Sequence, residues 1–359
     1  MTAEEMFFVW LHYEGLTRKK LWWVMENYQP YTSFGKALQQ NDSTAITYLG
    51  EELARKIQKD LSNENILKHA NMLAKHNISV LLASHKAYPQ ELLCLEEDAP
   101  PILYYKGNVN VLSSRKIAVV GTRKPTQYAR EMTAKFSAGL AEKGFTVVSG
   151  LAYGIDTEAA VATLGVHKPT IAILANGLDT VYPEQNTMLA RKIEENGLLL
   201  SENPMHTQPQ PYQFLERNRI ISALSEGVLI VEAGEKSGAL NTAQHAINQG
   251  KELFVLPSLL TNKQGRGSNR LLTEVPDAFT TSVEDICARL HVEIVSTSEQ
   301  MPMLTENEQK VYAILEEGET EFDVLQERTN MDTCELNSLL TSMEIRGIIR
   351  KLPANFYSL

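Results

Sequence analysis

Aromatic and cationic side chains alternate in residues 208–221, QPQPYQFLERNRII, and this segment holds the residue types best suited to chemistry. Its prolines favour an extended approach, Tyr212 and Phe214 lie two residues apart, and Arg217 and Arg219 flank an asparagine before an apolar helix. Aromatic faces stack on bases and guanidinium groups hold phosphates, the combination expected at a sequence-tolerant site for a single nucleic-acid strand. The segment therefore predicts contacts to both parts of a nucleotide chain.

A structural role is the alternative for either arginine taken alone. Each guanidinium could brace a sheet edge through an ion pair with Glu202 or Glu232. If Arg123, Lys124 and Lys236 converge on the same edge, anion binding becomes the better interpretation. A phosphodiester or a nucleotide would then be the natural ligand.

Six short apolar segments, most of them separated by amphipathic helices, must position these side chains. We expect buried strands at Ile117–Val120, Thr146–Ser149, Thr170–Ala175, Leu198–Ser201, Val228–Glu232 and Leu253–Leu256. A β-α-β series implies a parallel sheet with right-handed crossovers, so the loops after the strands open on one edge. Loop N–H groups and helix N termini at such an edge favour anions.

The candidate ligand-binding residues lie mostly in those loops. The candidates for contacts to DNA or phosphate are Gly121, Thr122, Arg123, Lys124, Gly150, Gly154, Gly177, Phe214, Arg217, Asn218, Arg219, Lys236, Ser237, Gly238, Asn269 and Arg270. No catalytic residue and no metal ligand is among them.

A carboxylate pair near the same edge has two interpretations. Asp156 and Glu232 both follow predicted strands and could act as an acid and a base. Asp156 also stands where an N-cap residue would start a helix at Thr157, and a carboxylate there accepts hydrogen bonds from free N–H groups. We prefer the N-cap interpretation.

Several cofactor classes lack their sequence patterns. Residues 121–126 lack the second and third glycines of a dinucleotide-binding turn, and no GxxxxGK[ST] loop occurs. The eight histidines are dispersed, and Cys94, Cys287 and Cys334 form no CxxC pair. We therefore expect no cofactor, no metal and no disulfide framework.

Composition sets the outer limits. The chain has 359 residues, 43% of them hydrophobic, which is enough for two or three domains. It has no 18-residue apolar run and no secretory signal, so we expect no membrane span and a cytoplasmic location. The net charge of -10 restricts any nucleic-acid site to a local basic patch.

Residues 1–76 show helical spacing and predict a small N-terminal domain. Its segment 15–20, GLTRKK, resembles the glycine turn of a helix-hairpin-helix, but Thr17 stands where a second glycine would lie. Phosphate binding there and a packing module with a solvated basic turn remain alternatives. The main domain is expected over residues 77–292, with an edge strand or connector at Ile78–Leu82.

A polar passage at residues 293–303 predicts a linker, and residues 304–359 have the helical spacing and terminal hairpin of a winged-helix-like domain. This last part holds 5 basic and 11 acidic residues. Its expected recognition helix, Asp332–Glu344, includes Glu335 and would repel phosphate. We therefore expect it to contact protein or support a dimer.

Five ordered motifs resemble the DNA-processing protein A family (DprA, also called Smf). They are IAVVGTRKPTQYAR, VVSGLAYGID, TIAILANGLDTVYPEQN, LLLSENP and FLERNRIISALSEGVLIVEAGEKSGALNTAQHAINQG. The resemblance implies an extended Rossmann-like domain that binds single-stranded DNA without strong sequence preference, protects incoming DNA in natural transformation and loads the RecA recombinase. It also implies a homodimer without enzymatic activity. By the same resemblance, Arg123, Arg217, Asn218 and Arg219 bind the strand or shape its pocket.

The chain departs from the family pattern at several positions. These are Glu184 where a lysine is frequent, Ala160 in place of a histidine, Leu215 in place of a proline, Ser258 in place of a glycine, and Val275-Pro276 in place of glycine-alanine. An anion at position 184 should weaken phosphate binding. Either Lys263, Arg266 and Arg270 rebuild the site, or this member binds DNA weakly.

Two hypotheses follow. The first is a non-catalytic protein that binds single-stranded DNA and passes it to RecA. The second is a nucleotide-binding or nucleotide-cleaving enzyme of a related Rossmann-like group, with its pocket around Gly121, Gly150, Gly177 and Gly238.

Overall fold

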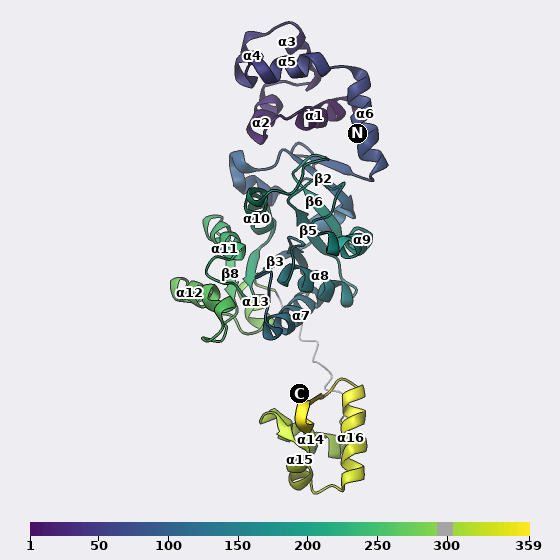
Figure 1. The fold of residues 1–359 in the computed structure, drawn as a ribbon, viewed down its shortest axis with the longest axis vertical. Coiled ribbons are helices and arrows are strands. Elements are labelled where there is room, and N and C mark those ends of the chain that lie inside the picture. The colour runs from purple at the N-terminus through teal and green to yellow at the C-terminus, as the bar shows by residue number, and fades with distance from the viewer. Residues whose placement is uncertain (293–303) are drawn as a thin grey trace. The chain divides into compact units, whose positions relative to one another are not determined.

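The computed structural model describes residues 1–292 and 304–359 (Figure 1). Two compact units make up the chain, Met1–Glu293 and Ile294–Leu359. The expected linker at 293–303 lies outside the described residues. The domain limits expected from the sequence stay predictions, because the first unit runs without a break from the N-terminal helices into the sheet.

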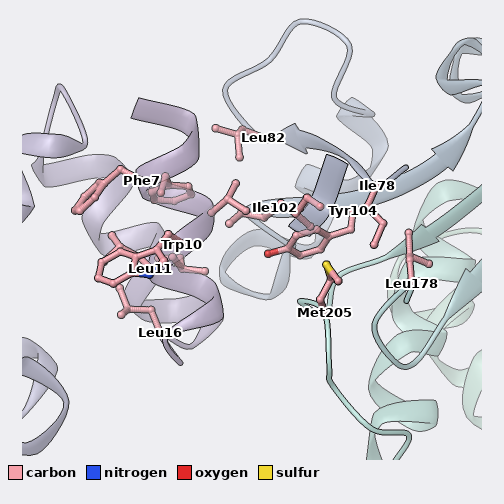
Figure 2. Close-up of a cluster of buried hydrophobic side chains, with 14 of the residues drawn as sticks. Phe7, Trp10, Leu11, Leu16, Ile78, Leu82, Ile102, Tyr104, Leu178 and Met205 are labelled. Carbon is pink, nitrogen blue, oxygen red and sulfur yellow. The ribbon is translucent and has the colours of Figure 1, made fainter. Parts of the chain in front are cut away.

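Six helices begin the first unit. They are α1 (Ala3–Tyr13), α2 (Arg18–Asn27), α3 (Thr32–Gln39), α4 (Ser43–Leu49), α5 (Glu51–Asp60) and α6 (Asn63–Lys75). Thr2 and Glu5 form a capping box that starts α1. Phe7, Trp10 and Leu11 on α1 belong to the same continuous core as Ile102 and Tyr104 of the sheet (Figure 2). The helices therefore pack on the sheet through apolar side chains.

An eight-stranded sheet forms the centre of this unit, in the order β1-β2-β6-β5-β4-β3-β7-β8. Its strands are β1 (Ser79–Leu82), β2 (Ile102–Gly107), β3 (Lys116–Val120), β4 (Thr146–Ser149), β5 (Thr170–Leu174), β6 (Leu198–Ser201), β7 (Gly227–Ile230) and β8 (Glu252–Val255). The six strands expected from the sequence are β3 to β8, and they pair in parallel. The expected edge strand is β1. It pairs antiparallel with β2, and β2 pairs antiparallel with β6, so these two strands extend the parallel sheet at one end.

Alternate residues of β3 enter two different cores. Ile117 and Val119 pack with α7 (Gln127–Glu142) and α8 (Ile155–Gly165), whereas Ala118 and Val120 pack on the opposite face. That second face is covered by α10 (Pro211–Leu224) and α11 (Gly238–Asn248) (Figure 1). The remaining helices are α9 (Thr187–Asn196), α12 (Arg266–Glu274) and α13 (Val283–Arg289), and the short 3-10 segments include η1 (Gln90–Asp98).

The strand order reverses between β3 and β7. From β3 the chain adds β4, β5 and β6 on one side, and it then returns to place β7 and β8 on the other. At such a topological switch point, the loops after neighbouring strands separate and leave a crevice outside their carboxyl ends. The loops after β3 and β7 contain Arg123 and Lys236.

Histidines line the junction between the N-terminal helices and the sheet. His12 Nδ1 lies 3.0 Å from the hydroxyl of Tyr104, and the ring of Tyr13 packs 4.4 Å from that of His69. Burial and the neighbouring His69 lower the pKa of His12 to about 4. Burial and the neighbouring His206 also lower the pKa of His69 to about 4. Both imidazoles are therefore neutral at neutral pH.

The second unit has three helices and a small antiparallel sheet. Its elements are α14 (Glu306–Glu316), β9 (Thr320–Glu321), α15 (Phe322–Thr329), α16 (Thr333–Ile345), β10 (Arg350–Leu352) and β11 (Phe356–Ser358). The strand order is β10-β11-β9, so the expected terminal hairpin gains a third strand. Asp332 accepts hydrogen bonds from Cys334 N and Glu335 N and caps α16, the expected recognition helix.

Across residues 1–292 and 304–359, every helix is too short or too polar to span a lipid bilayer. Within the same residues, no three histidine, cysteine or carboxylate side chains are grouped so that they could hold a metal ion.

Candidate anion-binding site

A cavity of about 770 Å³ lies at the switch point, outside the carboxyl ends of β3 and β7. Ten of the expected residues line it: Gly121, Thr122, Arg123, Lys124, Phe214, Arg217, Asn218, Lys236, Ser237 and Gly238. We call this space the anion cavity. The loop after β3, helix α10 and the start of α11 bring together residues that are more than 100 positions apart in the sequence.

Arg217 is buried at the inner wall of the anion cavity, with 4% of its surface exposed. Its Nη1 donates to the carbonyl oxygen of Gly150 at 2.7 Å and to that of Ile173, at the ends of β4 and β5. Burial lowers its pKa to about 10, against the opposing effect of Asp156, so the guanidinium stays charged at neutral pH. A Cβ atom on Gly150 would overlap this guanidinium, which explains the glycine.

Asp156 lies one position inside α8, and the expected N-cap role is wrong. The N-cap is Gly154, with a φ of +76°, and the helix begins at Ile155. The Asp156 carboxylate instead turns back to accept hydrogen bonds from Gly150 N at 3.0 Å and Ala152 N at 3.4 Å. Burial raises its pKa, while the charge of Arg217 opposes that shift. Asp156 therefore fixes the loop that Arg217 contacts.

Glu232, the other carboxylate considered, holds two loops together. It accepts hydrogen bonds from Thr126 N and Thr126 Oγ1, both at 2.9 Å, and from Asn262 Nδ2 at 2.5 Å. Its side chain is buried. Glu232 therefore positions the loop that contains Arg123 and does not pair with Arg217 or Arg219.

Cationic and aromatic side chains line the open side of the anion cavity. The Arg123 guanidinium lies over the ring of Phe214, and Tyr182 packs 5.5 Å from the same ring. Arg123, Lys124 and Lys236 are exposed, and none of them makes an ion pair within the described residues. Their positive charges are thus available to a ligand.

The N terminus of α11 opens into the anion cavity. Ser237 is its N-cap, and its hydroxyl accepts a hydrogen bond from Ala239 N at 3.3 Å. Asn218 Nδ2 donates to Gly238 O at 3.4 Å and to Asn241 Oδ1 at 3.2 Å, which joins α10 to this helix end. The free N–H groups and the dipole of α11 add partial positive charge to the cavity.

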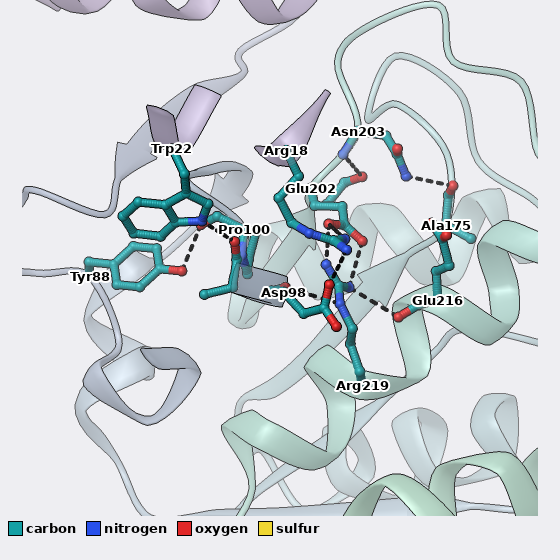
Figure 3. A network of polar contacts seen from close by, with 12 residues as sticks. Arg18, Trp22, Tyr88, Asp98, Pro100, Ala175, Glu202, Asn203, Glu216 and Arg219 are labelled. Atoms are coloured by element: carbon teal, nitrogen blue, oxygen red, sulfur yellow. Dashed lines mark hydrogen bonds and ion pairs between the residues drawn. The ribbon is translucent and has the colours of Figure 1, made fainter. Parts of the chain in front are cut away.

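Arg219 points away from the anion cavity and braces the sheet, as the structural alternative predicted. Its Nη atoms donate to Glu202 at 2.6 and 2.7 Å, and its Nε donates to the carbonyl oxygen of Asp98 at 3.1 Å (Figure 3). Arg18 on α2 pairs with the Asp98 carboxylate and lies 3.7 Å from Glu202. We call the residues Arg18, Asp98, Glu202 and Arg219 the junction network.

The basic turn near α2 is largely engaged in internal contacts. Besides Arg18, Lys19 pairs with Glu97 at 3.3 Å, and Lys20 donates to the carbonyl oxygen of Leu49 at 2.7 Å. These contacts favour the packing-module interpretation over phosphate binding at this turn.

The other expected residues lie beside the anion cavity or apart from it. Gly154 lines an adjoining cavity of about 460 Å³ together with Arg123 and Lys124. Asn269 exchanges hydrogen bonds with the backbone of Ser258 at 3.0 and 2.8 Å and so holds the loop after β8. Arg270 pairs with Glu274 at 3.3 Å. Gly177 is buried, and a Cβ atom there would lie 2.6 Å from Pro204 O.

Tyr182 and Gln264 are among the lining residues that were missed as site candidates. Tyr182 precedes Pro183 in the loop after β5, and Gln264 lies between Lys263 and Arg266. The aromatic-proline pair was the available signal for Tyr182, whereas nothing in the sequence distinguished Gln264. Glu184, the expected source of weaker binding, is exposed and is not among the residues that line the anion cavity.

This fold and this cavity define an extended Rossmann-like protein with a cationic cavity at its switch point. The family model described as DNA recombination-mediator protein A matches residues 79–291, and the DprA winged helix domain matches residues 295–355. The chain belongs to the DNA-processing protein A family (DprA/Smf).

Individual relatives agree with this membership. The chain is 40% identical to DNA processing protein DprA of Bacillus subtilis over 60% of its own length and 72% of the relative. It is 34% identical to protein Smf of Escherichia coli over 89% of this chain and 87% of the relative.

Two solved structures have the same fold. Streptococcus pneumoniae DprA superposes with a TM-score of 0.69 at 29% identity, covering 80% of this chain and 98% of that one. Helicobacter pylori DprA, whose structure concerns a single-stranded DNA binding mode, superposes with a TM-score of 0.54 at 34% identity. The match covers 60% of this chain and 95% of that one.

Proposed function

We propose that the protein binds single-stranded DNA in the anion cavity. The observation that carries the proposal is the combination of a buried guanidinium with exposed cations and an aromatic pair. Arg217, Arg123 and Lys124 supply positive charge for phosphates, and Phe214 and Tyr182 supply faces on which bases stack. The likeness to the H. pylori DprA that has a single-stranded DNA binding mode supports the same ligand.

Binding through these groups is sequence-tolerant. Phosphates are common to every nucleotide, and every base has a face that can stack on an aromatic ring. Gly154 and the adjoining cavity extend the cationic surface past Arg123 and Lys124, so the strand continues beyond one nucleotide. A site of this kind suits a protein that covers DNA of any sequence.

We propose a non-catalytic role for this site. The two carboxylates considered as an acid and a base, Asp156 and Glu232, are occupied by backbone and side-chain donors that fix loops. With both carboxylates in these positions, each acts as a structural acceptor. The protein then holds and transfers DNA in the cytoplasm without cutting it.

Family membership supports the proposed partners. The matching family is described as a recombination mediator, which supports transfer of the bound strand to a RecA-type recombinase in natural transformation. A homodimer is also proposed, and the exposed side chains of Leu259 and Leu260, at 72% and 87%, are candidates for its contact. Light scattering of the wild type and of Leu259→Asp with Leu260→Asp tests this contact.

The winged-helix unit is proposed to contact protein. The outer face of α16 presents Asn337, Thr341 and Ile345, with Ile345 82% exposed. The cation at the end of this face, Arg346, pairs with Glu308, so its charge is already engaged. The net charge of residues 304–359 is -6, which also opposes phosphate binding by this unit.

Fluorescence anisotropy with an unstructured labelled oligonucleotide tests the DNA proposal. The Arg123→Ala, Lys124→Ala variant is expected to bind more weakly, with a salt slope smaller by about 0.7 for each lost phosphate contact. Arg191→Ala, Lys192→Ala on α9 is the matched control, because both cations are exposed and lie outside the anion cavity.

The anisotropy measurement, combined with a thermal-shift titration with mononucleotides, distinguishes the DNA-binding protein from the alternative of a nucleotide-binding enzyme. Unchanged oligonucleotide affinity in the Arg123, Lys124 variant, together with mononucleotide binding or cleavage, would establish the nucleotide-binding enzyme in place of the DNA-binding protein.

A further inference from the structure

A second pocket, of about 340 Å³, lies between helices α2 and α4 and segment η1. Its aromatic lining consists of Trp22, Trp23 and Tyr48, and its acidic lining of Glu26, Glu96 and Glu97. We call it the aromatic pocket. It shares no lining residue with the anion cavity, and its charge has the opposite sign.

The aromatic walls are held in place before any ligand arrives. The rings of Trp23 and Tyr48 stack with centroids 4.1 Å apart and planes 14° apart. Trp22 Nε1 donates to the carbonyl oxygen of Ala99 at 2.7 Å, close to Tyr88 (Figure 3). Trp22 and Trp23 are partly buried, and Tyr48 is 39% exposed. Accessible ring faces with fixed positions suit a cation, which the ring quadrupole attracts.

Two of the three carboxylates of the aromatic pocket have no ionic partner among the described residues. Within the described residues, Glu26 and Glu96 make no ion pair, and Glu97 pairs only with the exposed Lys19. The charged groups that line the pocket are therefore three carboxylates and one ammonium. A phosphate would be repelled here, so the bound DNA strand is not the occupant.

We propose that the aromatic pocket binds a lysine or arginine side chain from a basic segment of a partner protein. The cation lies against Trp23 or Trp22, and Glu26 and Glu96 accept its N–H groups. The chain's own linker is not the occupant, because residues 293–303 contain no lysine or arginine. A side chain on a peptide is favoured over a free cation because Leu93, 41% exposed at the same pocket, offers an apolar contact to a neighbouring residue.

Tryptophan emission gives a direct measurement of this site. Two of the chain's three tryptophans line the pocket, and the third, Trp10, is buried in the core. The probe is a labelled peptide of sequence Gly-Gly-Arg-Gly-Arg-Gly-Gly, titrated into the full-length protein by anisotropy and by tryptophan fluorescence. We expect saturable binding with a Kd below about 1 mM, accompanied by a change in tryptophan emission.

Matched peptides and variants decide the outcome. Replacing both arginines of the probe by uncharged citrulline is expected to lower its affinity at least about tenfold, as is Glu26→Gln with Glu96→Gln in the protein. Glu52→Gln with Glu64→Gln removes two exposed carboxylates outside the pocket and should leave peptide affinity unchanged. Thermal unfolding of each variant checks that the fold is intact.

Several results would overturn the proposal. These are equal binding of the arginine and citrulline peptides, no loss in the Glu26, Glu96 variant, or a Kd above about 1 mM. Tetramethylammonium that binds as tightly as the peptide would show a site for a small free cation instead. Oligonucleotide affinity is expected to be the same in the wild type and the Glu26, Glu96 variant, so this test is independent of the DNA proposal.

Discussion

The Cζ atom of Arg123 lies 5.3 Å from the centre of the Phe214 ring, which joins the loop after β3 to helix α10. The guanidinium can contact a phosphate while the ring offers its other face to a base. One contact therefore combines the two recognition chemistries that a single strand presents.

Phe214→Ala should weaken oligonucleotide binding by roughly 1 to 3 kcal/mol, because a stacking face is lost. The slope of log Kd against log salt should stay as in the wild type, since no phosphate contact is removed. Phe279→Ala, which removes a ring that is 56% exposed and lies outside the anion cavity, is the control for surface aromatics. Anisotropy at several salt concentrations measures both quantities, and a changed slope would contradict the assigned role.

Gly150→Ala should destabilise the protein by roughly 1 to 3 kcal/mol and weaken DNA binding, because the new methyl group displaces the Arg217 guanidinium. Gly165→Ala is the matched control, since a Cβ at the end of α8 meets open space. Urea unfolding gives the stability of each variant. Equal stability of the two variants would show that Arg217 can move aside.

Glu202→Gln should destabilise the protein by roughly 3 to 5 kcal/mol, because it leaves the buried Arg219 guanidinium without its carboxylate. Arg18→Met should cost much less, since Arg18 is more exposed than Arg219. Chemical unfolding of both variants checks the order. A larger effect for Arg18 would mean that the N-terminal helices depend on its ion pairs more than on apolar packing.

Stability should fall as the pH drops from about 6.5 towards 4. His12 and His69 have folded pKa values of about 4, below the usual 6.5, so between these values the unfolded chain binds more protons. Their contribution is full above pH 6.5 and decreases by up to about 1.4 kcal/mol per pH unit for each histidine.

Urea unfolding from pH 7 to pH 4 measures this dependence. His12→Gln is expected to flatten the pH profile, while His76→Gln at an exposed position is expected to leave it as in the wild type. A wild-type profile that is flat over this range would contradict neutral burial of the two histidines.

A chain that ends at residue 303 should bind the oligonucleotide with an affinity within about twofold of the full chain, because the acidic winged-helix unit is not expected to contact phosphate. Anisotropy and circular dichroism on both chains give affinity and fold. A large loss of affinity would show that this unit contributes to DNA binding.

The positions of the parallel strands were predictable because buried parallel strands appear in the sequence as short runs rich in β-branched residues. The six runs from Ile117 to Leu256 all became strands with end positions within two residues of those expected. The antiparallel pair β1 and β2 was only partly predictable. The passage around Pro100-Pro101 indicated an edge strand or a connector, whereas β2 pairs with β6 as well as with β1.

The directions of single side chains were less predictable. Arg217 and Arg219 are two residues apart on one helix, so they point to different sides, and the sequence does not say which side faces the cavity. Asp156 was misassigned because the local sequence does not distinguish an N-cap carboxylate from a carboxylate at the second position of the helix. Tyr182 comes from a different loop, and only the fold brings it next to Phe214.

The fixed position of Arg217 also affects how much side-chain conformational entropy is lost when DNA binds. Its guanidinium is already held by two carbonyl groups, so a phosphate that reaches it does not have to freeze a long side chain. Arg123 and Lys124 are exposed, and each loses rotamer freedom when it closes on the strand. We therefore propose that the inner wall of the cavity acts as a rigid anchor, and that the two exposed cations at its mouth control how fast the strand is released.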